Sequence, residues 1–144
     1  DQVETRDNLR VVSDIGSRLP IYCTSQGKVF LAHMSRTSAE ALLRAQHMTQ
    51  FTPHTITDLT ALMQEIDLCR ANVYAIENGE YKIGLRSISA PVYTVEGKAR
   101  YTVGVIGMFR STRSDEFLAA VEQVCATASM ISTALGYRKT EELL

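Results

Sequence analysis

PIYCTSQGK, residues 20–28, leads from a proline and an apolar pair through small polar side chains to an apolar run that starts at Val29. Thr24 or Ser25 is a suitable N-cap, so the stretch predicts a helix that begins here and runs to Met34. The first backbone N–H groups of a helix lack intrahelical acceptors and carry the positive end of its dipole, which suits a carboxylate. A plain helix cap, the commoner use of such residues, explains the same spacing.

The first half of the chain predicts two extended segments and two more helices. The extended segments are Leu9–Ile15, which ends before a glycine, and Leu19–Tyr22. The second helix has Thr37 or Ser38 as its cap, and the third, with apolar residues at helical spacing, closes near Arg70. Three helices are therefore expected before the main strands.

The second half of the chain changes from helical to alternating periodicity. Strands are predicted over Val73–Glu77, Ser87–Tyr93 and Ala99–Phe109, and the last two form a hairpin. The third of these is apolar on both sides, which predicts a central strand that is covered on both faces. A final amphipathic helix starts at Thr112 or Ser114 and stops at a glycine. The pattern indicates an α+β sheet layered with helices.

The composition indicates one soluble domain of 144 residues without a metal, a cofactor or a membrane segment. No apolar run approaches the roughly twenty residues of a membrane span, and no leader opens the chain, so we expect a cytoplasmic protein. The three cysteines are widely spaced without a C-x-x-C pair, which indicates a reducing compartment. Basic residues total 15 against 16 acidic ones, so this chain alone is not expected to bind DNA.

Four motifs follow one another along the chain: RLPIYCTSQGKVFLA (18–32), Glu80-x-x-x-Gly84, SAPVYTVEGK (89–98) and LGY (135–137). Together they resemble the effector-binding domain of the IclR family of bacterial transcription regulators. The resemblance implies an α+β, GAF-like fold. In that fold a mixed, largely antiparallel sheet has helices packed on one face and a ligand pocket on the other.

The resemblance also implies that residues 1–144 are one effector-binding domain and only part of a longer regulator. In the family a winged helix-turn-helix domain precedes this one and binds operator DNA. The chain also begins later than its relatives' effector domains, so we expect a fragment that lacks the first elements of its own fold. An unpaired sheet edge tends to recruit another chain, and a dimer or tetramer is expected.

By the same resemblance, the pocket binds a small organic acid that alters oligomer arrangement and DNA binding. Ser25 and Gln26 would offer backbone N–H groups to the acid. A glycine and an isoleucine on the central strand would leave an apolar, roomy wall, which favours an acid with an apolar or aromatic body. The ligand-binding residues implied are Cys23, Ser25, Gln26, Glu77, Ser87, Gly104 and Ile106, with no catalytic residue and no metal ligand.

Two other functions remain open at this point. A GAF-like thiol enzyme of the sulfoxide-reductase type would use Cys23, but its chemistry needs an accessible thiolate. A buried cysteine is more often a small apolar filler. The second alternative is a dimerisation domain with a vestigial pocket.

Overall fold

The computed structural model describes residue 3 and residues 14–139 of the chain. Their helices and strands are, in order, α1 (Ser25–Ala32), α2 (Arg36–Arg44), α3 (Leu59–Asn72), β1 (Ala75–Asn78), β2 (Arg86–Tyr93), β3 (Ala99–Gly107) and α4 (Asp115–Ala134). The expected α+β class is confirmed. The strand expected over Leu9–Ile15 falls mainly on residues 4–13, which lie outside the described residues. The segment Leu19–Tyr22 contains no strand and ends in a bend, which corrects the second expected extended segment.

The three strands form an antiparallel sheet in the order β1-β2-β3. The central strand of the described sheet is therefore β2, and β3 is an edge strand. On β3, the exposed fractions of Tyr101, Val105 and Ile106 are 58%, 43% and 46%. The expectation of a central strand covered on both faces is thus wrong for the described part of the chain, because apolar composition does not reveal how many neighbours a strand has.

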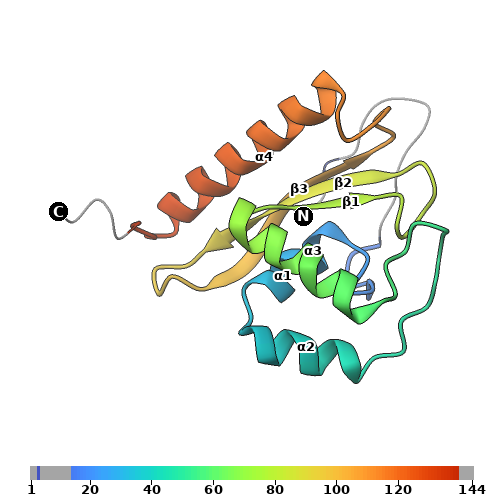
Figure 1. Ribbon diagram of the computed structural model, residues 1–144. Coiled ribbons are helices and arrows are strands. Elements are labelled where there is room, and N and C mark those ends of the chain that lie inside the picture. The colour runs from blue at the N-terminus through green and yellow to red at the C-terminus, as the bar shows by residue number, and fades with distance from the viewer. Residues whose placement is uncertain (1–2, 4–13, 140–144) are drawn as a thin grey trace.

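The sheet lies between two layers of helix (Figure 1). The long helix α4 covers one face, and α1, backed by α2 and α3, covers the other. Helices thus flank both faces, where the family resemblance implied only one. The alternation of side chains on β2 explains the difference between the layers. Ile88, Ala90 and Val92 pack with α4 in an apolar cluster, whereas Ser87 and Ser89 face α1.

The helix α4 is apolar for its length. Its 20 residues include a window of mean hydropathy 1.3, so by length and composition alone the helix could span a membrane. No segment of this kind was predicted from the sequence. Its buried side chains, Phe117, Val124, Ala128 and Ser132, recur at helical spacing and lie on the sheet side. This packing identifies α4 as the covering helix of the domain's own sheet.

Each of the four helices in the described part of the chain begins at a side chain that accepts a hydrogen bond from a first-turn N–H group: Thr24, Ser35, Asp58 and Ser114. The first and last of these caps were predicted. The predicted caps of α2, Thr37 and Ser38, lie inside the helix instead, because an earlier serine takes the role. At the other end of α3, Val73 ends the helix with a φ of 61°, so β1 begins two residues later than predicted.

Gly27 allows α1 to pack closely against the segment before it. A Cβ atom at this position would lie 2.1 Å from the carbonyl oxygen of Ile21 and 2.6 Å from its Cα atom. Only glycine fits such an approach of two backbones. The start of α1 is therefore held against the bend that precedes Thr24.

Candidate functional site

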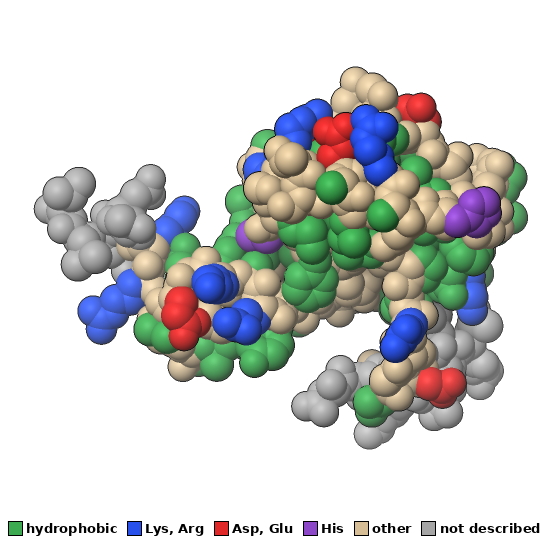
Figure 2. Space-filling view, turned by 90° about the horizontal axis from the view of Figure 1, so that it is seen from below, with side chains coloured by type: hydrophobic (Ala, Val, Ile, Leu, Met, Phe, Trp, Pro, Cys, Tyr) green, Lys and Arg blue, Asp and Glu red, His purple; other side chains and the backbone are tan. Residues whose placement is uncertain are grey.

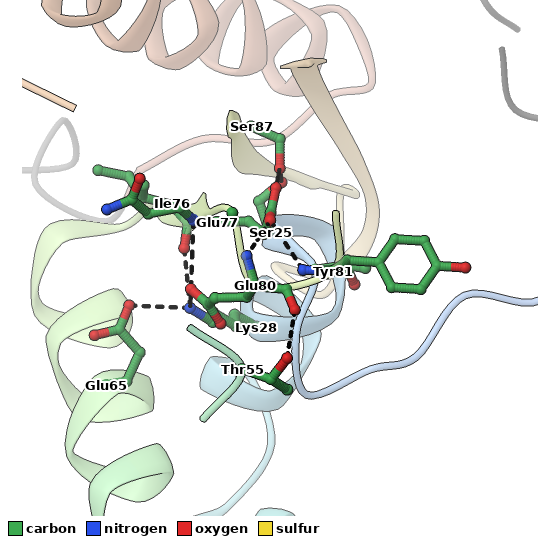
Figure 3. Close-up of polar contacts among 12 residues, drawn as sticks. Ser25, Lys28, Thr55, Glu65, Ile76, Glu77, Glu80, Tyr81 and Ser87 are labelled. Atoms are coloured by element: carbon green, nitrogen blue, oxygen red, sulfur yellow. Dashed lines mark hydrogen bonds and ion pairs between the residues drawn. The ribbon is translucent and has the colours of Figure 1, made fainter. Parts of the chain in front are cut away.

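A chain of buried serine hydroxyls joins the start of α1 to the central strand (Figure 3). Ser25 Oγ lies 2.8 Å from Ser87 Oγ and 2.8 Å from Ser89 Oγ. All three serines are at most 3% exposed. Because residues two apart on a strand share a face, Ser87 and Ser89 both point at the first residue of α1.

The hydrogen bonds of this chain have a direction. Ser87 donates to Glu77 Oε2 over 3.2 Å. Since a hydroxyl has one proton, Ser25 then donates to Ser87, and Ser89 donates to Ser25. The 3.4 Å contact from Ser25 to Gln26 Oε1 is longer and competes for the same proton. The three serine protons are thus used within the chain and on Glu77, so none of these hydroxyls can donate to a ligand without breaking one of these bonds.

Glu77 is the acceptor at the end of this chain. Its Oε1 atom accepts from the backbone N–H groups of Glu80, at 2.7 Å, and Tyr81, at 3.2 Å (Figure 3). The residue is only 3% exposed. Glu77 therefore closes the turn after β1 with both carboxylate oxygens engaged in hydrogen bonds.

Lys28, one turn along α1 from Ser25, forms a buried ion-pair cluster (Figure 3). Its Nζ atom lies 2.6 Å from Glu80 Oε1, 3.0 Å from the Ile76 carbonyl oxygen and 3.2 Å from Glu65 Oε1. Burial lowers the pKa of Lys28, but the two carboxylates outweigh it and leave that pKa above its usual value. Within the described residues, no group of three His, Cys, Asp or Glu side chains is placed to hold a metal ion.

The sheet brings Gly104 and Ile106 to the same place. They stand opposite Ser89 and Ser87 in the β2–β3 register, so they share the face that α1 covers. A Cβ atom on Gly104 would lie 2.4 Å from Ser89 Oγ and 2.5 Å from the Ile88 carbonyl oxygen. The space that the sequence assigned to a ligand beside Gly104 is therefore taken by Ser89. Within the described residues, these positions are also on an outer strand of the sheet, not on its central one.

Gln26 is half-buried and follows Ser25 in the first turn of α1, and its Oε1 atom lies 3.4 Å from Ser25 Oγ. It borders a groove of about 270 Å³ whose other lining residues are Leu19, Ile21, Thr24, Gly27 and Phe30. The groove is mainly apolar, and it opens beside the first turn of the helix. The ligand-binding roles assigned to this residue and to the other six positions stay predictions.

Sequence reasoning missed Ser89 and Lys28. The signal for Ser89 was its spacing of two from Ser87 on one strand, which places both hydroxyls on one face. The signal for Lys28 was a lysine directly before the apolar residues of a short helix, which indicates a buried lysine that needs an acidic partner. That partner is Glu80, the first residue of the second motif. A buried lysine is rare without such a partner.

Cys23 is fully buried, and burial, reinforced by Glu80 and Glu77 and opposed by Lys28, raises the pKa of its thiol to about 12. At pH 8 it is therefore a thiol, not the thiolate that nucleophilic chemistry needs. We expect iodoacetamide to leave Cys23 unmodified in the native protein at pH 8 and to alkylate it in urea, as mass spectrometry of peptides would show. The half-buried Cys125 serves as an internal comparison. Rapid native alkylation of Cys23 would revive the thiol-enzyme alternative.

The sequence matches the family described as Bacterial transcriptional regulator IclR C-terminal over residues 1–133. The chain belongs to this family. The IclR-type resemblance seen in the four motifs is thereby confirmed, and so is the link to transcription regulation. The curated relatives of this IclR-family chain are named as transcriptional repressors.

The IclR-family chain is 28% identical to the HTH-type transcriptional repressor AllR of Escherichia coli K12 over 137 residues. This alignment covers 95% of the chain and 51% of AllR. IclR of Thermotoga maritima shares its fold with a TM-score of 0.83 at 29% identity, over 95% of this chain and 56% of that one. The repressor BlcR of Agobacterium tumefaciens is similar in structure with a TM-score of 0.77 at 31% identity, over 88% of this chain and 51% of the BlcR chain. The chain spans about half the length of the curated relatives it matches.

Proposed function

We propose that this chain is the ligand-sensing domain of a bacterial transcription regulator, and that it binds a small organic acid at the start of α1. The observation that supports this most directly is the pair of backbone N–H groups of Ser25 and Gln26, which have no acceptor within the described residues. Two free N–H groups at the positive end of a helix suit a carboxylate.

The groove beside Gln26 supports an acid with an apolar body. Leu19, Ile21 and Phe30 line it, so methylene or aromatic carbons placed there lose contact with water. Each buried methylene is worth about 0.8 kcal/mol. An acid whose carboxylate meets the N–H groups and whose body fills the groove is therefore favoured over a two-carbon acid.

The test combines an acid screen with two variants of Ser25. Proline is tolerated in the first helical turn, and Thr24, with φ −124° and ψ 145°, has the extended backbone that a residue before proline needs. Ser25→Pro removes both the N–H and the hydroxyl, whereas Ser25→Ala removes only the hydroxyl. We expect the proline variant to bind acids roughly tenfold to hundredfold more weakly than the alanine variant, the value of a hydrogen bond to a charged group.

Calorimetry with glyoxylate, pyruvate, 2-oxobutyrate and benzoate would measure this difference. A bound acid at ten to a hundred times its dissociation constant also adds roughly 1.4 to 2.7 kcal/mol to the free energy of unfolding, which a thermal-shift assay detects. Equal affinity of folded Ser25→Pro and Ser25→Ala proteins would show that the N–H groups do not hold the acid.

In the whole regulator, the acid would change the populations of dimer or tetramer arrangements and so the spacing of attached DNA-binding domains. DNA contact belongs to a domain outside this chain, whose formal net charge is −1. On the face drawn in Figure 2, basic side chains stand in small separate groups, several beside acidic ones, and form no broad positive patch. A regulator that meets both operator DNA and metabolites would work in the cytoplasm.

The second candidate is a dimerisation domain with a vestigial pocket. It is favoured by the closed serine chain, in which Ser25, Ser87 and Glu77 satisfy one another's hydrogen-bonding groups. The acid screen separates the two candidates, because a vestigial site would give no thermal shift with any acid.

A further inference from the structure

The buried ammonium group of Lys28 ties α1 to three other parts of the fold. Its acceptors are Glu80 after β1, the Ile76 carbonyl oxygen on β1, and Glu65 on α3. An ammonium group has three protons, and these three contacts use all of them. The Lys28 side chain is 0% exposed, so this is a buried charge whose partners are fixed.

Lys28 stands among groups of opposite charge. The carboxyl groups of Glu65 and Glu80 form ion pairs with it, and its charge opposes the rise in the pKa of the Cys23 and Cys69 thiols. Glu77 is linked to this cluster through the backbone N–H of Glu80. In the described part of the chain, no other cation forms an ion pair with Glu65 or Glu80. One positive charge therefore faces two carboxylates, and the cluster keeps a formal excess of negative charge.

The same cluster leads back to the start of α1. Glu80, held by Lys28, donates its backbone N–H to Glu77 Oε1 at 2.7 Å, and Glu77 accepts from Ser87. Ser87 is bonded to Ser25, which lies one turn before Lys28 on the same helix. The contacts close a ring from α1 through the turn after β1 and β2 to α1 again (Figure 3).

One atom of this ring has no partner. Glu80 Oε2 is buried, and it has no hydrogen-bond donor among the described residues. Burial raises the pKa of Glu80, and Lys28 opposes that rise. Without Lys28, a buried and half-satisfied carboxylate would stand next to the residues that fix Glu77, and near the place where the acid is proposed to bind.

We propose that Lys28 is the counter-charge of the acid site: it neutralises Glu80, so that an anion can bind at the start of α1 although the carboxylates of Glu77 and Glu80 belong to the same hydrogen-bonded ring. This inference rests on the proposed function. It goes further, because it makes acid affinity depend on the net charge of a cluster that the acid does not contact.

The test varies that net charge with isosteric changes. Lys28→Met adds one unit of negative charge to the cluster, Glu80→Gln removes one, and the double variant has the wild-type balance without the ion pair. Benzoate affinity, measured by calorimetry at pH 8, is expected to fall roughly tenfold or more in Lys28→Met, to rise roughly threefold to tenfold in Glu80→Gln, and to return near the wild-type value in the double variant. Benzamide, the uncharged counterpart, should not follow this order.

The exposed Glu40→Gln change on α2 is the matched control, because it alters the protein's charge by the same amount away from the cluster. If Lys28→Met does not fold, Glu80→Gln still decides the question, since Lys28 keeps Glu65 and the Ile76 carbonyl oxygen.

A purely structural role predicts the opposite order, because every variant that lacks the ion pair would bind benzoate more weakly. The inference would therefore be wrong if Glu80→Gln bound benzoate no more tightly than the wild-type protein, or if the double variant bound it as weakly as Lys28→Met. Neither result would contradict the proposed acid site. Failure of the wild-type protein to bind any of the four acids would instead refute the proposed function, and the inference with it.

Discussion

Gly27→Ala is expected to lower the free energy of unfolding by about 3 kcal/mol, the upper end of what overpacking a tight site costs. Helix propensity alone predicts the reverse sign, because alanine is about 1 kcal/mol better than glycine inside a helix. The clash decides, since the added Cβ would lie 2.1 Å from the carbonyl oxygen of Ile21 and 2.6 Å from two further backbone atoms. Backbone atoms cannot rotate away as a side-chain end does.

Urea unfolding followed by circular dichroism would measure this loss. Gln26→Ala is the matched control, because it changes the neighbouring position of the same helix turn without a close backbone contact, and it should alter stability by less than about 0.5 kcal/mol. A Gly27→Ala protein as stable as wild type would mean that Ile21 and α1 are not held in this close approach.

The elements with local signals were predictable. Thr24 and Ser114 cap their helices as expected, because an N-cap needs only a suitable side chain next to a helical pattern. Gly79 and Gly97 have positive φ values at the two predicted turns, and Gly136 has one just after α4. Such features depend on a few neighbouring residues, so one sequence contains what decides them.

The features that depend on distant partners were not predictable from pattern alone. The strand β3 is as apolar as a central strand, but among the described residues it pairs with β2 alone, and such pairing depends on segments far away in the sequence. Lys28 is buried because Glu65 and Glu80, 37 and 52 residues away, meet it. Periodicity shows which face of a helix a residue occupies, but it does not show which charged side chains from other elements pack against that face.

The candidate site shows the same division. The family resemblance named Ser25, Glu77 and Ser87 as ligand-binding residues, and the structure joins these three by hydrogen bonds, while their ligand-binding role stays a prediction. The motifs did not show that Ser89 fills the room beside Gly104, because that contact depends on the β2–β3 register. The space beside Gly104, which was interpreted from the sequence as room for a ligand, is thus a contact between β2 and β3. A substitution at Gly104 therefore tests the packing of these strands.

Gly104→Ala is accordingly expected to destabilise the protein by about 2 to 3 kcal/mol, although alanine is intrinsically better than glycine in a strand by roughly 0.5 to 1 kcal/mol. The added Cβ would lie 2.4 Å from Ser89 Oγ, which can rotate, and 2.5 Å from the Ile88 carbonyl oxygen, which cannot. Combining the change with Ser89→Ala should therefore recover only part of the loss in a double-mutant cycle measured by urea unfolding.

Gly107→Ala on the same strand is the control. The nearest atom to its added Cβ would be a ring carbon of Phe109 at 3.4 Å, so this change should leave stability nearly unchanged. Complete rescue by Ser89→Ala would assign the whole clash to the hydroxyl, and a neutral Gly104→Ala would show that the strands have room for a side chain and that the sequence-based interpretation of an open wall was right.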